Sequence, residues 1–196
     1  MDTPPRNTLG WPAHVAVPEN LAIKTAPMTH PMMERAFLHA MKHQVLQAAS
    51  GMRAVTSTLV AQDGTITMGV AGELCDTVND KSMDDITYHA QTGKCDRVQS
   101  DGNVDYNKCP GCRHDRHSEQ CAIHKALRDG VHLAGSEIYL YGQWWVCEPC
   151  SGKAVSVGVQ TIYLLPNAKE LFDRGAPGQA ERLKAFQDEW QQKISL

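Results

Sequence analysis

The chain has 196 residues, of which 42% are hydrophobic and 21% charged, and its formal net charge at pH 7 is −3. This length and composition predict one soluble globular domain, and we expect neither a membrane span nor a secretory signal, because no apolar run is long enough. The mildly acidic balance argues against a protein that coats duplex nucleic acid, since such proteins normally carry a basic stripe.

Seven cysteines are spread through the chain, and four of them form two pairs with Cys-x-x-Cys spacing. The pairs are Cys109 with Cys112 and Cys147 with Cys150. An odd number of cysteines that includes two such pairs is more typical of metal ligands than of a disulfide framework. We therefore expect a reducing, cytoplasmic environment.

Residues 1–31 contain six of the ten prolines and no sustained hydrophobic periodicity. We interpret them as an extended N-terminal arm, followed by a single domain over residues 32–196. The first predicted helix is capped by Thr29, has Pro31 in its first turn and ends at Gly51. Its expected apolar stripe recurs every three or four residues and consists of Phe37, Met41, Val45 and Ala48.

His39 and His43 lie four residues apart on this predicted helix. The spacing could place both imidazoles on one metal ion. No glutamate completes the metalloprotease arrangement around them, so we favour two solvated histidines on the helix surface.

Two short segments rich in β-branched residues follow, at 53–61 and 65–70, on either side of Asp63-Gly64. This pattern predicts a β-hairpin. Residues 72–116 then lose all alternation and contain four of the seven cysteines. We expect an insertion that is stabilised by zinc rather than by a hydrophobic core.

The second half of the chain alternates between helical and strand patterns. We expect helices over residues 118–128, 147–157 and 179–191, and strands over 137–141 and 160–165. Strands that are separated by single helices favour parallel pairing in a layered α/β fold.

His117 and Glu119 begin one of these predicted helices, and Cys147 and Cys150 begin another. One imidazole and two thiolates provide three zinc ligands and leave a fourth position for water, which is typical of a catalytic site. The helix N-termini would stabilise the thiolates. Glu119 could reach the water without binding the metal and pass its proton to a ring nitrogen. A structural zinc site is the alternative, but neither motif offers a fourth protein ligand.

His-x-Glu followed by Cys-x-x-Cys is the signature of zinc deaminases, and the longer match resembles the cytidine/deoxycytidylate deaminase superfamily. Residues 117–123 read HSEQCAI, where deoxycytidylate deaminases typically have HAExNAI. Residues 117–165 resemble the family well, and residues 53–71 resemble it weakly. The resemblance implies a three-layer α/β/α cytidine-deaminase-like fold with a mixed central sheet and with zinc between two helices.

The sequence also departs from the family pattern. Val146 stands where proline usually precedes the first cysteine of the pair, and Cys121 replaces a common asparagine. The Gly-x-Asn that would contact the sugar is missing near residues 69–72, and no fifth strand is predicted after Pro166. These departures bear on the substrate more than on the chemistry.

The resemblance implies hydrolytic deamination, in which Glu119 takes a proton from a zinc-activated water, protonates N3 of cytosine and then protonates the departing ammonia. We expect dCMP as the substrate, dUMP as the product and a homo-oligomeric protein, as is frequent in the family. Alternatives with the same chemistry are cytidine, cytosine, guanine, a modified nucleotide, and a tRNA or single-stranded DNA, which the acidic charge disfavours. A non-catalytic zinc-binding module is the alternative of another class.

A second, structural zinc site is predicted around the zinc-knuckle turn of Cys109 and Cys112, with Cys95 as third ligand. Some deoxycytidylate deaminases carry a structural zinc in an insertion at this place. The candidates for the fourth ligand are Cys75, His89 and His114. Free thiols are one alternative, and a cluster in which His117 joins the zinc-knuckle cysteines is another.

Trp144 and Trp145 precede the second motif and could form a wall on which a base stacks, or could belong to the core or to an interface. Arg113 and Arg116 flank the predicted pocket in sequence and could bind a 5′-phosphate, although solvated charges are the simpler interpretation. Cys121 is expected to be a small buried residue rather than a ligand.

Overall fold

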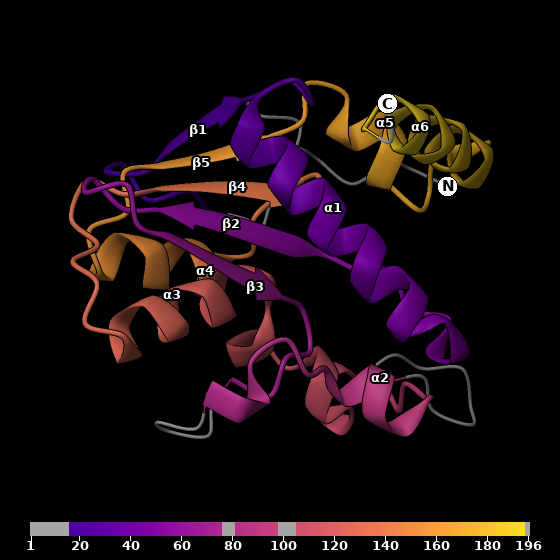
Figure 1. Cartoon of the computed structure of the whole chain (residues 1–196), viewed down its shortest axis with the longest axis horizontal. Helices are drawn as coiled ribbons and strands as arrows, with labels where there is room; N and C mark the ends of the chain where they lie inside the picture. Colours follow the sequence, from indigo (N-terminus) through magenta and orange to yellow (C-terminus); the bar gives the residue numbers. More distant parts are fainter. Residues whose placement is uncertain (1–15, 76–80, 98–104, 195–196) are drawn as a thin grey trace.

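Figure 1 shows the computed structural model of the chain, which describes residues 16–75, 81–97 and 105–194. Five strands form one mixed sheet in the order β1-β5-β4-β2-β3. The strands are β1 (Ala22–Thr25), β2 (Thr56–Val60), β3 (Ile66–Val70), β4 (Glu137–Tyr141) and β5 (Thr161–Leu164). β1, β5 and β4 run parallel, which confirms the predicted parallel pairing, whereas β2 lies antiparallel to both β4 and β3.

Helices cover both faces of the sheet, so the predicted three-layer α/β/α fold is confirmed. In Figure 1, α1 lies on one face, against β2 and β4, whereas α3 and α4 lie on the other, with α3 packed on β3 and β2. The helices are α1 (Pro31–Leu46), α2 (Tyr88–Thr92), α3 (Ser118–Arg128), α4 (Glu148–Ser156), α5 (Ala168–Phe172) and α6 (Gln179–Ile194). None of the described helices is long and apolar enough to cross a membrane.

The hairpin and the elements of the second half agree closely with the sequence patterns. β2 pairs antiparallel with β3, and Gly64 in the turn has φ 84°. α3 and β4 span the predicted residues, and α4 and β5 are one residue shorter at each end than predicted. These segments carry strong local signals, because short runs rich in β-branched and apolar residues are bounded by turn residues, and the helices begin and end at recognisable positions.

β1 is the strand that the sequence patterns missed, and it comes from residues assigned to the N-terminal arm. The backbone N–H of Ala26, just after β1, donates to the carbonyl of Leu164 at 2.9 Å, and Leu21 is buried in the core. Residues 16–31 therefore belong to the folded domain. The sequence patterns missed β1 because a four-residue strand is too short to show a clear alternation. The rest of the predicted arm, residues 1–15, lies outside the described residues.

The apolar stripe predicted for the first helix is wrong in its C-terminal half. Val45 is 77% exposed, and Ala48 lies beyond the end of α1. The buried face instead carries Met33, Ala36, Phe37, His39, Ala40 and His43. The cap is also one residue later than predicted, because the His30 side chain, not Thr29, accepts the capping hydrogen bond.

His39 and His43, which were predicted to be solvated, are buried in the structure. Their rings pack edge to face with centroids 4.5 Å apart. Burial lowers the pKa of both imidazoles from 6.5 to about 4, so both are neutral at pH 7. The surface interpretation fails because both histidines lie on the buried face of α1, where Asp85 of the insertion contacts His39, and no pattern within the helix reveals this contact.

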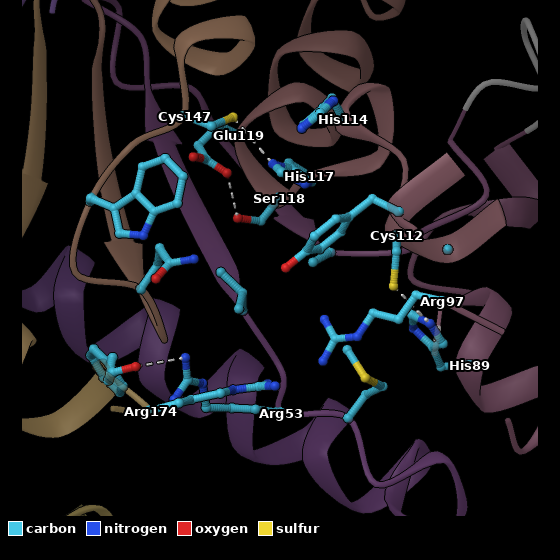
Figure 2. Close-up of a pocket in the computed structure, with 18 of the residues that line it drawn as sticks. Arg53, His89, Arg97, Cys112, His114, His117, Ser118, Glu119, Cys147 and Arg174 are labelled. Carbon is cyan, nitrogen blue, oxygen red and sulfur yellow. Dashed lines mark hydrogen bonds between the residues drawn. The ribbon is translucent and has the colours of Figure 1, made fainter. Parts of the chain in front are cut away.

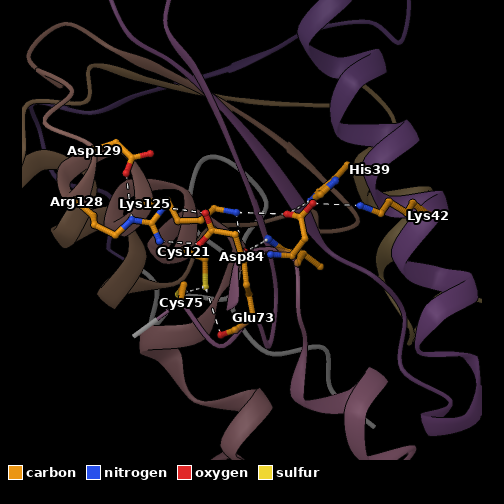
Figure 3. A network of polar contacts seen from close by, with 11 residues as sticks. His39, Lys42, Glu73, Cys75, Asp84, Cys121, Lys125, Arg128 and Asp129 are labelled. Carbon is orange, nitrogen blue, oxygen red and sulfur yellow. Dashed lines mark hydrogen bonds and ion pairs between the residues drawn. The ribbon is translucent and has the colours of Figure 1, made fainter. Parts of the chain in front are cut away.

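A network of charged side chains joins α3 to the insertion (Figure 3). Nζ of Lys125 on α3 lies 2.6 Å from the buried carboxylate of Glu73, and Glu73 also accepts a 2.7 Å hydrogen bond from the backbone N–H of Asp85. Arg128 donates two hydrogen bonds of 2.7 Å to the carboxylate of Asp84. The network therefore holds α3, and the residues at its N-terminus, against the insertion.

Candidate active site

Three of the predicted metal ligands meet where two helices begin. His117 caps α3 and Cys147 caps α4, and both have an extended backbone, with φ −69° and −71°. Nδ1 of His117 lies 3.4 Å from Sγ of Cys147 and 3.5 Å from Sγ of Cys150. These three residues are positioned to hold a metal ion, and no fourth protein ligand joins them within the described part of the chain. We call them the open group.

The chemistry of the two sulfurs fits a cation at the open group. Hydrogen bonding by Cys150 and His117 lowers the pKa of Cys147 to about 4, so this thiol ionises readily. Its hydrogen bond with Cys147, together with burial, raises the pKa of Cys150. Two neighbouring thiolates repel each other, and a divalent cation between them would remove this repulsion, because a coordinating thiol is deprotonated outright.

The carboxylate of Glu119 lies beside the open group, in the first turn of α3 (Figure 2). It is buried, and Oγ of Ser118 donates to its Oε2 at 3.0 Å. Oγ of Ser118 also lies 2.8 Å from Oγ of Ser57 on β2. Burial, and then the negative charge of Cys147, raise the pKa of Glu119. The carboxylate is thus held in one orientation, in surroundings that favour proton uptake.

The start of α3 approaches the sheet at Gly69 on β3. A Cβ at this position would lie 2.2 Å from the carbonyl oxygen of Ser118 and 2.5 Å from the backbone nitrogen of Ala122. A side chain would therefore push α3 away from the sheet. The absence of a side chain at Gly69 helps to set where His117 and Glu119 lie.

A cavity of about 520 Å³ opens beside the open group and Glu119 (Figure 2). Its volume is in the range of pockets that bind small molecules. Trp144 and Trp145 both line the cavity and both pack against the hydrophobic core. Further polar side chains in the lining are Gln47, Arg53, Arg97, Tyr106, Gln143 and Arg174.

A second set of ligands lies in the insertion and has four members. Nε2 of His89 lies 3.3 Å from Sγ of Cys109 and 3.6 Å from Sγ of Cys112, while Sγ of Cys95 lies 3.8 and 3.5 Å from the same two sulfurs. These four residues, which we call the closed group, are positioned to hold a metal ion. Gly111 leaves room for the imidazole, because a Cβ there would lie 2.8 Å from Cε1 of His89.

Two candidates for the fourth ligand in the insertion are wrong, since His89 takes that position. Sγ of Cys75 instead lies 2.7 Å from Sγ of Cys121, which is buried as predicted. His114 packs edge to face on His117, with ring centroids 5.2 Å apart. The alternative in which His117 joins the zinc-knuckle cysteines is also wrong, because His117 belongs to the open group.

The arginines predicted to bind a phosphate do not line the cavity. Arg113 is exposed, and its Nε donates to the carboxylate of Asp115 at 3.1 Å. The carbonyl of Arg116 accepts a 2.7 Å hydrogen bond from the backbone N–H of Gly72. Three other arginines line the cavity, namely Arg53, Arg97 and Arg174. Sequence reasoning missed them because they come from three separate loops and form no motif.

A third group of potential ligands, His39, His43 and Asp85, lies outside the cavity. Oδ1 of Asp85 lies 3.6 Å from Nε2 of His39 and 3.4 Å from Nζ of Lys125, and Oδ2 lies 3.2 Å from Nζ of Lys42. Two ammonium groups already offset the charge of this carboxylate, so a metal ion would meet their repulsion. The three residues fit the polar network of Figure 3 better than they fit a metal site.

Comparison with known proteins adds no family to this description. The chain matches no protein-family model, and a search of curated proteins finds no significant match. The open group, Glu119 and the adjoining cavity are therefore the features of this chain that point to a function.

Proposed function

We propose that the protein is a zinc-dependent hydrolytic deaminase of a cytosine nucleotide, which converts dCMP and water into dUMP and ammonia. The observation that carries the proposal is the juxtaposition of the open group, the buried carboxylate of Glu119 and the adjoining cavity. A structural zinc site normally closes with a fourth protein ligand. An open set of three ligands, two of which (His117 and Cys147) line a cavity beside a carboxylate, supports catalysis instead.

Glu119 would carry out the proton transfers of this reaction. Zn²⁺ held by the open group would supply Lewis acidity, which lowers the pKa of a water molecule toward neutrality. The Glu119 carboxylate would carry both protons of the attacking water in turn, the first to N3 and the second to the leaving amine. A C4–O bond forms and the C4–N4 bond breaks, so water is consumed and ammonia is released. Ser118 and Ser57 would keep the carboxylate oriented throughout.

Two further features of the chain have a role in this proposal. Trp144 and Trp145 line the cavity, and either indole could stack on the base, an interaction that contributes about 1–3 kcal/mol per base. The closed group would hold a second, structural zinc, because burial lowers the pKa of His89 and keeps it in the neutral form that binds metals. None of the seven cysteines, all of which are described, forms a disulfide, which supports a reducing, cytoplasmic environment.

The proposal is tested by measuring ammonia release from dCMP, dCTP, deoxycytidine, cytidine, CMP, cytosine, guanine and adenosine. We expect selective release from dCMP. Release from another compound on the panel would retain the chemistry and replace the substrate. No release from any compound, by protein that carries its full complement of zinc, would overturn the proposal in favour of a binding module or of a polymeric substrate.

The Glu119→Gln variant tests the assigned role directly. We expect metal content unchanged and turnover reduced roughly 10²- to 10⁴-fold or more, because the proton carrier is removed and the metal ligands are kept. Glu189→Gln is the matched control, since Glu189 is an exposed glutamate that pairs with Lys193 on α6. Normal turnover in Glu119→Gln would refute the role.

A further inference from the structure

Three arginines converge on the cavity that contains Glu119. Arg53 lies just before β2, Arg97 lies in the insertion and Arg174 follows α5, so the three come from distant parts of the chain. Figure 2 shows all three on the side of the cavity away from Glu119 and Cys147. One cavity therefore has the candidate reaction centre at one end and three guanidinium groups toward the other.

No described carboxylate forms an ion pair with these three arginines. Within the described part of the chain, none of the three guanidinium groups forms an ion pair, whereas Arg113 and Arg128 each contact an aspartate. Within the described residues, this side of the cavity therefore carries positive charge that an anion could balance.

Arg53 is held in place while part of its hydrogen-bonding capacity stays unused. Its Nη2 donates to the carbonyl of Phe172 at 3.2 Å, and its guanidinium lies over the Phe172 ring, 5.2 Å from the centroid. Its Nε is buried without a hydrogen-bond partner. A buried donor without a partner is unfavourable, so a ligand that accepted a hydrogen bond here would be bound with additional affinity.

The three charges also act on one another. Burial, and then the charges of Arg174 and Arg97, lower the pKa of Arg53 to about 10. Arg53 is therefore still protonated at pH 7, and its repulsion with the other two guanidinium groups is present at neutral pH. Arg97 is positioned by an aromatic ring, since its guanidinium lies 5.6 Å from the centroid of Tyr106. Positioned like charges that lack a counterion are typical of a site built for an anion.

We propose that Arg53, Arg97 and Arg174 form the phosphate subsite of this cavity and select a nucleotide over the corresponding nucleoside or free base. The inference rests on the proposed deaminase function, in which the base lies at Glu119. A phosphate carries about two negative charges and accepts paired N–H bonds from guanidinium groups, so it suits three arginines better than a neutral sugar does. Arg113 and Arg116 thereby lose the role that their sequence positions suggested.

The same phosphate chemistry could come from the substrate or from a separate nucleotide that regulates the protein. The experiment separates these sources by measuring kcat and KM of the zinc-loaded full chain with dCMP and with deoxycytidine. In Arg174→Gln and Arg97→Gln we expect kcat/KM for dCMP to fall roughly tenfold to a hundredfold, mainly through KM, because each variant loses charge-assisted hydrogen bonds. The kcat/KM for deoxycytidine should not change.

Arg113→Gln is the matched control, because Arg113 is exposed and lies outside the cavity, and it should leave both substrates unaffected. An equal fall in kcat/KM for dCMP and for deoxycytidine would overturn the subsite. An unchanged KM for dCMP, together with a lost response to added dCTP, would also overturn it, because the arginines would then bind a regulating nucleotide. Metal content and circular dichroism of each variant exclude misfolding as the cause.

Calorimetric titration with dUMP and with inorganic phosphate keeps the subsite testable if no compound is deaminated. Binding of dUMP by the unmodified chain that is lost in Arg174→Gln and retained in Arg113→Gln would support the phosphate subsite even though the deaminase proposal had failed. Equal binding by all three proteins, or binding by none, would overturn the subsite.

Discussion

The open group and the closed group hold similar ligands in different ways. The open group takes His117 and Cys147 from the caps of two helices that lie far apart in sequence but meet in the fold. The closed group takes its four ligands from one insertion, in which short turns and a five-residue helix bring them together. The packing of the layers of the domain fixes the geometry of the open group. The closed group links parts of the insertion to one another.

This difference leads us to expect that the two regions depend on metal in different ways. When the ligands lie in a segment without a hydrophobic core of its own, metal binding stabilises the folded form of that segment. In the open group, His117 caps α3, which packs on β3 and β2, and the position of these strands is already fixed by the sheet. We therefore expect metal loss to cost stability at the closed group and activity at the open group.

The largest expected effect comes from removing one ligand of each group. In Cys109→Ser we expect one metal ion fewer per chain and a free energy of unfolding that is lower by several kcal/mol. The reason is that binding of structural zinc contributes on the order of 10 kcal/mol in small domains. For a chain of this size such a loss lowers Tm by roughly 10 °C or more. Thermal unfolding, with the metal content measured on the same samples, tests this expectation.

Cys147→Ser is the companion variant, since it removes a ligand of the open group. We expect it also to lose one metal ion, to lose turnover and to keep most of its thermal stability. Equal Tm values for the two variants, at equal metal content, would contradict the division into structural and catalytic groups.

A smaller effect is expected from breaking the ion pair between α3 and the insertion. Lys125→Met leaves the buried carboxylate of Glu73 without its 2.6 Å partner, which should cost about 3–5 kcal/mol in urea unfolding. Replacing both residues, as in Glu73→Gln with Lys125→Met, should restore part of the loss. Lys184→Met on the exposed face of α6 is the control and should change stability by less than about 0.5 kcal/mol.

The smallest expected effect concerns the histidines that belong to neither group. The pKa of His39 and of His43 is lowered to about 4 in the folded chain from 6.5, so the unfolded chain binds more protons between these values. Their contribution to stability is complete above pH 6.5 and is lost as the pH falls toward 4. At pH 5 each ring should cost about 2 kcal/mol relative to pH 7.

Urea unfolding of the unmodified chain and of His43→Met between pH 7 and pH 5 isolates this effect from acid release of metal, which both proteins share. We expect a shallower pH dependence in His43→Met. His132→Gln, at an exposed position, should follow the unmodified chain. Identical slopes for all three would show that burial of the ring does not control its protonation.

Much of the candidate site could be predicted because it depends on short spacings at the starts of helices. His117 and Glu119 begin α3, and Cys147 and Cys150 begin α4, as their pattern indicated. The choice of His89 among three candidates could not be made, because it required knowing that Gly72 and Gly111 leave space for its ring.

The sequence by itself determined the hairpin, the helices and strands of the second half, and the three ligands and carboxylate of the proposed reaction centre. Local patterns suffice there, because an apolar run bounded by turn residues or a fixed ligand spacing is a property of neighbouring residues. Tertiary structure alone decided that β1 joins the sheet, that His39 and His43 are buried, and that Arg53, Arg97 and Arg174 share a cavity. Each of these depends on contacts between segments distant in sequence, and only the packing of the folded chain specifies such contacts.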